Sequence, residues 1–334
     1  MKAVVLKGIN VPLVVEEVPQ PEIGPEEALV QIKAASLNKR DWWIQQGKYA
    51  GLKFPIILGS DGSGIVTAVG ASLPDAWIGQ EVLLYPAENW GNSEQYQSKE
   101  FKILGMPENG CFASYVRVNG DMLFPKPAHL SFEEAAALPV AGLTAYRALF
   151  IRGQWAPGDK VLISGVGGGA GAFALQLAIA AGAEVWVTSG SNEKISQAVT
   201  LGARGGVNYK EADWAEILKG KAGAFEVIID SALGEGFAEL IGLCTEGARV
   251  VFFGGTAGNI PPLNGRPIFW KQINILGTTL GSPRDFEKML SFIKEKQVFP
   301  VIDGVFSMDE AEKAIKSMNA GTSKFGKTIL KIDS

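Results

Sequence analysis

The stretch from Lys160 to Gly182 reads KVLISGVGGGAGAFALQLAIAAG. It begins as a short apolar run that is typical of a buried strand and ends in an Ala- and Leu-rich sequence that favours a helix. The turn between them contains five glycines, namely Gly165, Gly167, Gly168, Gly169 and Gly171. Without Cβ atoms, these glycines let a ligand approach the backbone, and the first amides of the following helix point into the turn. We expect Ala170, in the same turn, to contact the ligand as well.

Tight turns also use glycine without any ligand, so the context of the turn matters. Here the turn follows a strand, opens a helix over 171–181 and is followed by a second apolar strand at 184–188. This order is that of a dinucleotide-binding unit, and it predicts that the turn holds a pyrophosphate.

The composition is that of an ordinary globular protein. With 334 residues, 47% of them hydrophobic and 20% charged, the chain suits two domains with large cores. A net charge of −4 does not indicate nucleic-acid binding, and no apolar run is long enough to span a membrane. The two cysteines, Cys111 and Cys244, lie far apart in the sequence. We therefore expect a cytoplasmic protein with neither a membrane nor a nucleic-acid partner.

The first 125 residues favour a β-rich domain. Their alternating segments are separated by Pro and Gly clusters and lie at 2–6, 28–34, 64–69 and 81–85. Ser131 and Glu134 then form a capping pattern that predicts the start of a helix.

From there strands and helices alternate. Six strands are predicted near 160–164, 184–188, 206–208, 226–230, 249–253 and 273–278. They describe an α/β domain with a doubly wound parallel sheet, the Rossmann arrangement. A helix over 284–296, a helix over 307–318 and a final strand over 328–332 are expected to return to the first domain. The predicted domains are thus 126–282 and a discontinuous β-rich domain formed by 1–125 and 283–334.

Several segments in one order carry a family resemblance. They are LNKRDWWIQQGKY at 37–49, GSDGSGIVTAVG at 59–70, AALPVAGLTAYRAL at 136–149, the glycine turn, and GTSKFGKTIL at 321–330. Along nearly its whole length the chain resembles the medium-chain dehydrogenase/reductase superfamily, above all its zinc-free quinone oxidoreductase-like branch. The resemblance implies a GroES-like catalytic domain, a Rossmann domain, an active site between them, and a homodimer or homotetramer.

The positions of the metal ligands differ from those of zinc-dependent relatives. Such relatives carry His-Glu where this chain has Ser60 and Asp61, and a cysteine where it has Asn38. Catalytic zinc needs about three protein ligands of the Cys, His or carboxylate type, so we predict no metal. The lone His129 is expected to be solvated or to cap a helix.

The stretch 87–105 replaces the structural-zinc lobe of the family and contains no cysteine. We expect it to be a loop held together by the packing of Trp90, Tyr96 and Phe101.

Without a Lewis acid, simple alcohol oxidation loses its usual catalyst. Reduction of an enone or a quinone depends less on a Lewis acid, because the resulting charge is delocalised onto an oxygen that hydrogen-bond donors can hold. This favours a small apolar carbonyl compound or quinone as the substrate.

The resemblance suggests four residues at the catalytic site. Asn38 would bind the ribose or the substrate, Tyr49 would donate a proton or bind the carbonyl, and Trp43 and Thr144 would lie beside the nicotinamide. Each also has a purely structural interpretation: a turn asparagine, a packed tyrosine or tryptophan, or a helical threonine bonded to its own backbone.

NADPH is predicted from the end of the second Rossmann strand. NAD-binding folds place a carboxylate there, whereas this chain has Ser189, Gly190 and Ser191. Lys194 and Tyr209 match positions that hold the 2′-phosphate in NADPH-dependent relatives, although Lys194 could be an ordinary solvated helix lysine. Further cofactor contacts are expected at Phe253, Gly254, Gly255, Thr279 and Leu280. Lys327 would reach the pyrophosphate or face water.

The sequence thus predicts an NADPH-dependent, zinc-free oxidoreductase that reduces an activated double bond or a quinone. Two alternatives remain open. One is a catalytically weak nucleotide-binding or structural protein of the same fold, and the other is an alcohol or aldehyde oxidoreductase.

Overall fold

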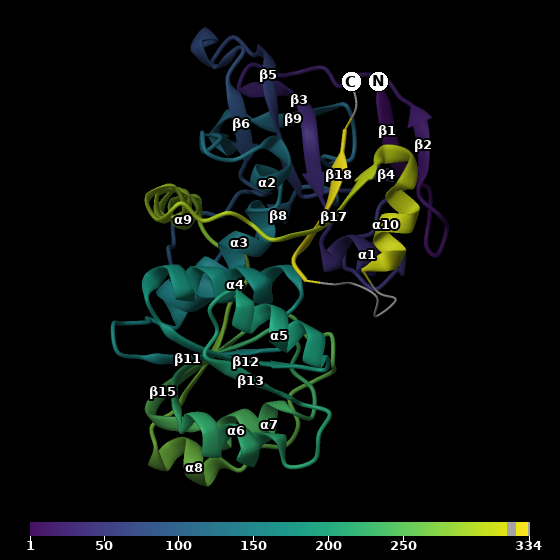
Figure 1. Ribbon diagram of the computed structural model, residues 1–334. Coiled ribbons are helices and arrows are strands. Elements are labelled where there is room, and N and C mark those ends of the chain that lie inside the picture. Colours follow the sequence, from purple (N-terminus) through teal and green to yellow (C-terminus); the bar gives the residue numbers. More distant parts are fainter. Residues whose placement is uncertain (319–324, 333–334) are drawn as a thin grey trace. The chain divides into compact units, whose positions relative to one another are not determined.

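A computed structural model describes residues 1–318 and 325–332 of the chain (Figure 1). Backbone contacts divide these residues into two compact units. The first comprises 1–140, 281–318 and 327–332, and the second comprises 141–280 with 325–326. Residues 321–324 of the segment GTSKFGKTIL lie outside the described residues.

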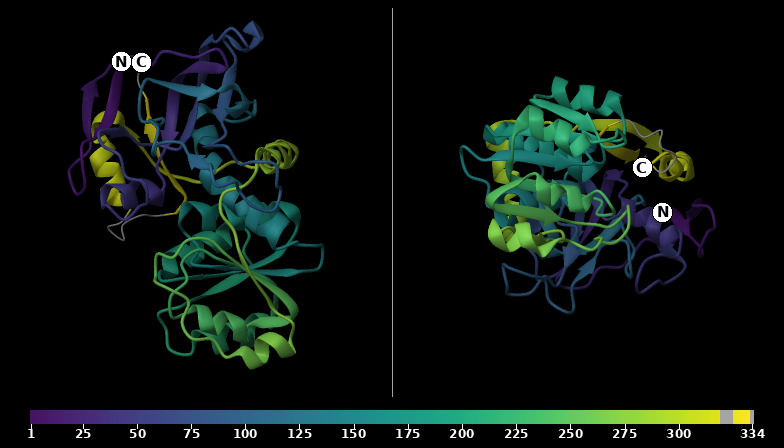
Figure 2. Two further views of the ribbon diagram at one scale, coloured as in Figure 1. Left: turned by 180° about the vertical axis from the view of Figure 1, so that it is seen from behind. Right: turned by 90° about the horizontal axis from the view of Figure 1, so that it is seen from below.

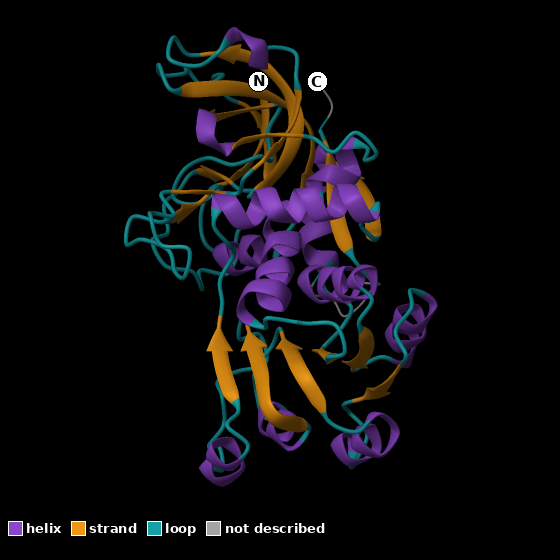
Figure 3. Cartoon of the chain, turned by 90° about the vertical axis from the view of Figure 1, so that its left-hand side faces the viewer, coloured by secondary structure: helices purple, strands orange, loops and turns teal. Residues whose placement is uncertain are grey.

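The second unit is built on a six-stranded parallel sheet. Its strands are β11 (Lys160–Ser164), β12 (Glu184–Ser189), β13 (Gly205–Asn208), β14 (Phe225–Asp230), β15 (Cys244–Phe252) and β16 (Asn274–Gly277). They lie in the order β13-β12-β11-β14-β15-β16, and every neighbouring pair is parallel, as the strand arrows in Figure 3 illustrate. This confirms the predicted doubly wound Rossmann sheet, in which the strand order reverses between β11 and β14.

Helices cover both faces of this sheet. In Figure 1, α4 and α5 lie on one side of it and α6, α7 and α8 on the other. They span Gly169–Ala181 (α4), Asn192–Thr200 (α5), Trp214–Ala222 (α6), Phe237–Gly242 (α7) and Gly265–Trp270 (α8). The apolar strands are buried on both faces because the helices pack there, and the core under α6 and α7 includes Leu162, Leu218 and Phe237.

The main sheet of the first unit explains why its sequence is discontinuous. The strands follow the order β10-β6-β5-β3-β18-β17, with β9 also paired to β3. Their bounds are Glu27–Ser36 (β3), Asp61–Val69 (β5), Glu81–Leu84 (β6), Tyr115–Asn119 (β9), Leu123–Pro125 (β10), Ile302–Ser307 (β17) and Lys327–Lys331 (β18). The C-terminal strand β18 pairs with β3 of the N-terminal part of the chain, and β17 is an additional strand that the sequence did not predict.

Two smaller sheets complete the strands of this unit. One has the order β2-β1-β4, with β1 at Lys2–Leu6, β2 at Val14–Glu17 and β4 at Ile56–Ile57. The other pairs β7 (Ala87–Glu88) with β8 (Lys102–Ile103). Both views of Figure 2 show α10 (Ala311–Ser317) beside the N-terminal strands, and α10 also contacts α1 (Lys39–Gln45).

Helix starts in this unit follow the capping chemistry of the sequence. The side chain of Ser131 accepts from the amide of Glu134 at 3.1 Å, and the carboxylate of Glu134 accepts from the amide of Ser131, which confirms the expected start of α2 (Phe132–Ala136). The long helix α9 (Pro283–Lys296) begins with the same device at Ser282. Because α2 packs against β3, β5 and β18, the unit extends to residue 140, beyond the boundary expected near residue 125.

The remaining helices are short. They are α3 (Pro139–Tyr146), a π-helical stretch η3 (Arg147–Arg152), and the 3₁₀ turns η1 (Asp75–Trp77), η2 (Gly120–Met122) and η4 (Met308–Glu310). Within the described ranges, no helix is long and apolar enough to cross a membrane.

The stretch 87–105 is held by fewer aromatic contacts than expected. The rings of Trp90 and Phe101 pack edge to face with centroids 5.5 Å apart, and Trp90 is buried. Tyr96 is 65% exposed, so its predicted packing role is wrong. Backbone acceptors take its place, because Trp90 Nε1 donates to the carbonyl of Ser93 and Ser98 Oγ donates to that of Asn89.

Candidate active site

The glycine turn joins β11 to α4 and leaves open space at the start of the helix. Gly165, with φ +74°, donates its amide to Thr188 Oγ1 at 3.1 Å, which ties the turn to β12. Gly168 is the N-cap of α4, and a Cβ added there would meet nothing within 4 Å. A Cβ on Gly171 would lie 3.4 Å from the carbonyl of Gly165, so the helix packs closely on the turn. The turn therefore has both the amides and the room that a phosphate group needs.

The end of β12 brings together the predicted 2′-phosphate residues. Ser189 is buried, and its carbonyl accepts from the amide of Tyr209 at 3.1 Å. The hydroxyl of Tyr209 would lie 2.8 Å from a Cβ added at Gly190. Ser191 caps α5, since its side chain accepts from the amide of Lys194. Serines and a tyrosine thus lie at this strand end, where NAD-binding folds hold a carboxylate.

Two lysines flank this strand end. The side chain of Lys194 extends over the glycine turn, because a Cβ on Gly167 would lie 2.7 Å from its Cδ and 3.5 Å from its Nζ. Lys210 comes equally near Gly190, with 2.9 Å between its Cε and an added Cβ. Sequence reasoning missed Lys210. The signal that could have found it is its place directly after Tyr209, beyond the end of β13.

The other predicted cofactor residues of this unit lie at the carboxyl ends of β15 and β16. The amide of Phe253 donates to the carbonyl of Asp230, and the amide of Thr278 donates to that of Phe252. Gly254 has φ +84°, a conformation that a side chain would strain, and Leu280 is buried with φ +42°. Gly255 and Thr279 follow the same strands. All are therefore at the edge of the sheet where open α/β folds bind ligands.

Asp230 lies at this edge too, at the end of β14. It accepts from the amides of Ala232 and Leu233, and burial raises the pKa of its carboxyl. Thr144 is buried on α3.

In the first unit Asn38 and Asp61 form a buried polar network. Asn38 precedes α1, and its amide nitrogen Nδ2 donates to Asp61 Oδ2 at 2.8 Å. Asp61 also accepts from Ser36 Oγ at 2.7 Å and, through Oδ1, from the backbone amide of Val140 at 2.9 Å. Asn38 is 8% exposed and Asp61 fully buried. The network fixes the amide of Asn38, so a ligand would have to use its second N–H.

Lys327 completes this network instead of facing a cofactor. Its ammonium donates to the carbonyl of Leu37 at 2.8 Å, to Asn38 Oδ1 at 2.8 Å and to Asp61 Oδ2 at 3.1 Å. A lysine ammonium has three N–H bonds, so these acceptors use all of them. Lys327 is 3% exposed. Neither contact with the pyrophosphate nor exposure to water, the two expectations for Lys327, fits this position.

A second buried cation lies next to Asn38. Arg40 Nη1 donates to Ser60 Oγ at 2.6 Å and to the carbonyl of Leu104 at 2.7 Å. Its guanidinium carbon lies 5.1 Å from the ring centroid of half-buried Tyr49. Sequence reasoning missed Arg40 because it stands between two charged residues at the start of a helix, where arginines are ordinarily solvated.

Asp41 is buried beside this cation. Its Oδ2 accepts from the amide of Asn38 at 2.7 Å, as in an N-terminal helix cap. Burial raises the pKa of its carboxyl from 3.8 to about 6, against the lowering effect of the Arg40 charge.

Trp43 lies on the same helix, edge to face with Trp42 at 4.4 Å between ring centroids. The ammonium of Lys48 lies 5.4 Å from the centroid of the Trp43 ring. Both aromatic side chains predicted for the site, Trp43 and Tyr49, are thus partly buried against a neighbouring cation.

The positions that carry metal ligands in zinc-dependent relatives, namely Asn38, Ser60 and Asp61, hold hydrogen-bonded polar groups in this chain. Two cations lie there, since Lys327 contacts Asn38 and Asp61 while Arg40 contacts Ser60. In the part of the chain that the structure describes, no group of three or more His, Cys, Asp or Glu could hold a metal ion.

The remaining His and Cys residues lie elsewhere. His129 Nε2 is 3.4 Å from the carbonyl of Val298, and its ring packs on Phe299. Both cysteines are buried as free thiols, and burial raises the pKa of Cys244 to about 12.

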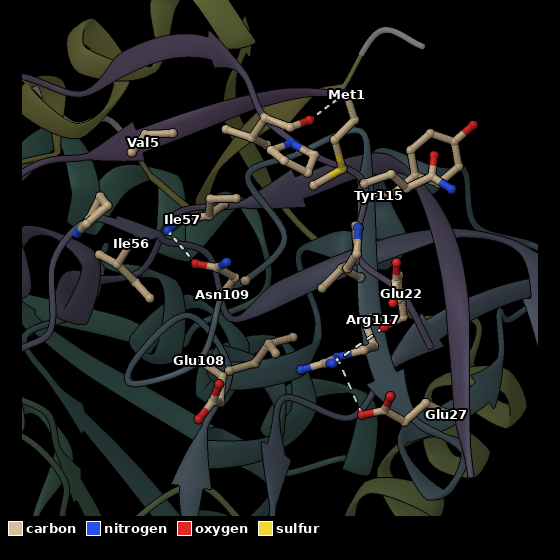
Figure 4. Close-up of a pocket in the computed structure, with 18 of the residues that line it drawn as sticks. Met1, Val5, Glu22, Glu27, Ile56, Ile57, Glu108, Asn109, Tyr115 and Arg117 are labelled. Carbon is tan, nitrogen blue, oxygen red and sulfur yellow. Dashed lines mark hydrogen bonds and ion pairs between the residues drawn. The ribbon is translucent and has the colours of Figure 1, made fainter. Parts of the chain in front are cut away.

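A pocket of about 620 Å³ opens in the first unit (Figure 4). Its wall includes Ile57, Tyr115 and Arg117, and Arg117 pairs with Glu27 at 3.4 Å. None of the predicted site residues lines it.

Comparison with known proteins agrees with this architecture. The profile of the family "Alcohol dehydrogenase GroES-like domain" matches residues 24–128, and that of "Zinc-binding dehydrogenase" matches residues 169–295. The zinc-type alcohol dehydrogenase-like protein of Schizosaccharomyces pombe is 36% identical over 328 residues, covering 95% of this chain and 94% of that protein. Quinone oxidoreductase of Mus musculus is 29% identical over 324 residues, covering 94% and 91%.

The fold also matches a solved structure. The crystal structure of an NAD-dependent alcohol dehydrogenase superposes with a TM-score of 0.93 at 34% identity, and the match covers 100% of both chains. The chain therefore belongs to the medium-chain dehydrogenase/reductase superfamily of oxidoreductases, as its motifs predicted.

Proposed function

We propose that the protein is an NADPH-dependent oxidoreductase that reduces an activated double bond or a quinone by hydride transfer without zinc. The observation that carries the proposal is a buried network in which Lys327 donates to Asn38 and Asp61, two of the positions that carry metal ligands in zinc-dependent relatives. An ammonium group already neutralises Asp61, and an amide and a hydroxyl are poor zinc ligands. The chemistry must then suit hydrogen-bond donors in place of a Lewis acid.

The second unit fits a nicotinamide dinucleotide. Gly165, Gly168, Gly169, Ala170 and Gly171 would hold the pyrophosphate, because the start of α4 offers free amides and open space. The backbone after β15 and β16, at 253–255 and 279–280, would meet the nicotinamide end.

NADPH is favoured over NADH by the charges at the end of β12. Lys194 and Lys210 approach this strand end, and Ser189, Ser191 and Tyr209 supply hydroxyl groups. Two cations and a strand end that carries serines in place of a carboxylate suit a 2′-phosphate, which brings about two negative charges, although Glu193 beside Lys194 weakens the local positive field.

The bound cofactor supplies a hydride. Asn38 and Trp43 would position the substrate, Thr144 would lie near the nicotinamide ring, and the hydroxyl of Tyr49 would hold the substrate oxygen or give it a proton. Delocalised charge on an enolate or hydroquinone oxygen needs only a few such donors. The similarity to a quinone oxidoreductase supports this substrate class.

A second candidate, an alcohol or aldehyde oxidoreductase, is supported by the match to an NAD-dependent alcohol dehydrogenase. A catalytically weak nucleotide-binding protein would keep the glycine turn that holds the pyrophosphate but would not turn over a substrate. We also propose a homodimer or homotetramer located in the cytoplasm, as the sequence predicts.

Oxidation of NADPH should be measured against a panel of quinones, enones, alkenals and aldehydes. We expect turnover with a quinone or an enone. Turnover confined to aldehydes would establish the alcohol dehydrogenase alternative, and nucleotide binding without turnover of any compound would establish the non-enzymatic one.

A further inference from the structure

The two buried cations of the first unit differ in how well their hydrogen bonds are satisfied. All three N–H bonds of Lys327 have acceptors. Arg40, 8% exposed, uses only Nη1, which donates to Ser60 and Leu104. Its Nε and Nη2 are buried and have no hydrogen-bond partner among the described residues. By the chemistry of a guanidinium group, three N–H bonds of Arg40 are therefore unused.

Unused donors on a buried cation are unfavourable for folding. Nearly all buried polar groups in native proteins are hydrogen-bonded, and a charged group that lacks partners loses more than a neutral one. The contact with the ring of Tyr49 is electrostatic and does not replace hydrogen bonds in the guanidinium plane. Asp41 follows in the sequence, and its Oδ1 is likewise buried without a hydrogen-bond partner, yet within the described ranges no hydrogen bond or ion pair joins it to Arg40. A ligand acceptor is the simplest partner for these donors.

We propose that Arg40 binds the carbonyl or quinone oxygen of the substrate and holds the negative charge that forms there. The proposal rests on the proposed function and identifies the group that replaces a Lewis acid. When a hydride from NADPH adds to the β-carbon of an enone, the π electrons move to the oxygen and form an enolate. A proton from water, passed on by the hydroxyl of Tyr49 or taken up directly, then adds to the α-carbon, which gives the saturated carbonyl compound and NADP⁺.

The surroundings of Arg40 suit this role. Ser60 and the carbonyl of Leu104 fix Nη1, so the guanidinium plane is held in place before a substrate arrives. Fixed donors in a dry site stabilise developing charge better than mobile ones in water. Asn38, which belongs to the adjoining network, is the N-cap of α1 and stands two residues before Arg40.

Access to these donors requires a movement. Because Nε and Nη2 are both buried, an oxygen can reach them only if a covering group shifts. Tyr49 contacts the guanidinium and is only partly buried, so it is the side chain that we expect to move.

Binding of 4-nitrophenol tests the proposal without any turnover. Its anion imitates an enolate, and 4-nitroanisole has the same ring without the charged oxygen. Above the pKa of the phenol, the wild-type protein should bind the phenolate about ten- to a hundredfold more tightly than the anisole, because a charge-assisted hydrogen bond contributes that much. Arg40→Gln should abolish this preference and Arg40→Lys should keep part of it. Arg284→Gln, which removes an exposed arginine of the same unit, should leave it unchanged.

Equal binding of phenolate and anisole by the wild type would overturn the proposal and would leave a bridging water as the partner of Arg40. A preference that survives in Arg40→Gln would overturn it too. If Arg40→Gln does not fold, the wild-type comparison and Arg40→Lys decide. NADPH binding, measured on the same proteins by fluorescence, separates this result from the proposed function. If the wild-type protein does not bind NADPH, the cofactor assignment is contradicted, whereas the role of Arg40 is still decided by the phenolate comparison.

Discussion

Single side chains at the end of β12 carry the proposed preference for NADPH. At the end of β12 the chain places two lysines and three hydroxyl residues where NAD-binding folds hold a carboxylate. The charge of Lys194 was expected from the sequence, whereas Lys210 became evident only when the fold brought it near Gly190.

Lys194→Ala should weaken NADPH binding and leave NADH binding nearly unchanged, because only NADPH carries the phosphate. A charge-assisted contact contributes about 1.5–3 kcal/mol before surface screening reduces it, so the loss should be about tenfold or more at low salt. Titration of both cofactors by fluorescence measures it. Equal losses for the two cofactors would mean that Lys194 supports the fold or the ribose.

Asp41 should make stability depend on pH. The pKa of Asp41 is about 6 in the folded protein and 3.8 ordinarily. Between these two pH values the folded state therefore holds a proton that the unfolded chain has lost. The free energy of unfolding should therefore fall as pH rises from about 4 to 6, by about 3 kcal/mol, and stay reduced above that range.

Asp41→Asn keeps an oxygen for the amide of Asn38 but does not titrate. Urea unfolding at pH 4 and pH 7 should thus show a smaller loss in this variant than in the wild type. The same pH dependence in both proteins would rule out Asp41 as its source.

At the scale of elements, apolar patterning predicted the Rossmann strands because most of them are short runs rich in β-branched residues between turns; β13, with two glycines, is the weakest of these runs. It did not predict β17, whose residues are mostly half-buried and include Gly304, so the run lacks a buried face. The residues of the glycine turn were identified from local sequence alone. The partners of Asn38 were not, because Asp61 and Lys327 lie 23 and 289 residues away from it and meet only through the pairing of β18 with β3 and of β3 with β5.

The glycine turn between β11 and α4 allows a test of where the pyrophosphate binds. Gly168 has φ −79° and open space where a Cβ would lie, so Gly168→Val should cost the fold only about 1 kcal/mol or less. The added side chain should nevertheless fill the phosphate position and abolish nucleotide binding. Thermal unfolding and NADPH titration on one sample measure both effects. Full NADPH affinity in this variant would show that the phosphate lies elsewhere.

At the scale of the molecule, a buried ion pair joins distant parts of the chain within the first unit. Lys327 on the last strand meets Asp61 on β5, so residues from the two ends of the chain stabilise one sheet. Lys327→Met leaves Asp61 buried without its cation and should lower the free energy of unfolding by about 3–5 kcal/mol.

Lys331→Met, an exposed position on the same strand, serves as the control and should be nearly neutral. NADPH affinity of the folded Lys327→Met protein should match that of the wild type. A selective loss of NADPH affinity with unchanged stability would instead support the pyrophosphate contact.

The chemistry proposed for this protein is hydride transfer without zinc. The most direct measurement is the rate of NADPH oxidation by the best quinone or enone acceptor, before and after exhaustive treatment with a zinc chelator, with zinc content determined on the same protein. We predict an unchanged rate and far less than one zinc ion per chain. A rate that falls with zinc content and returns when zinc is added would contradict the account.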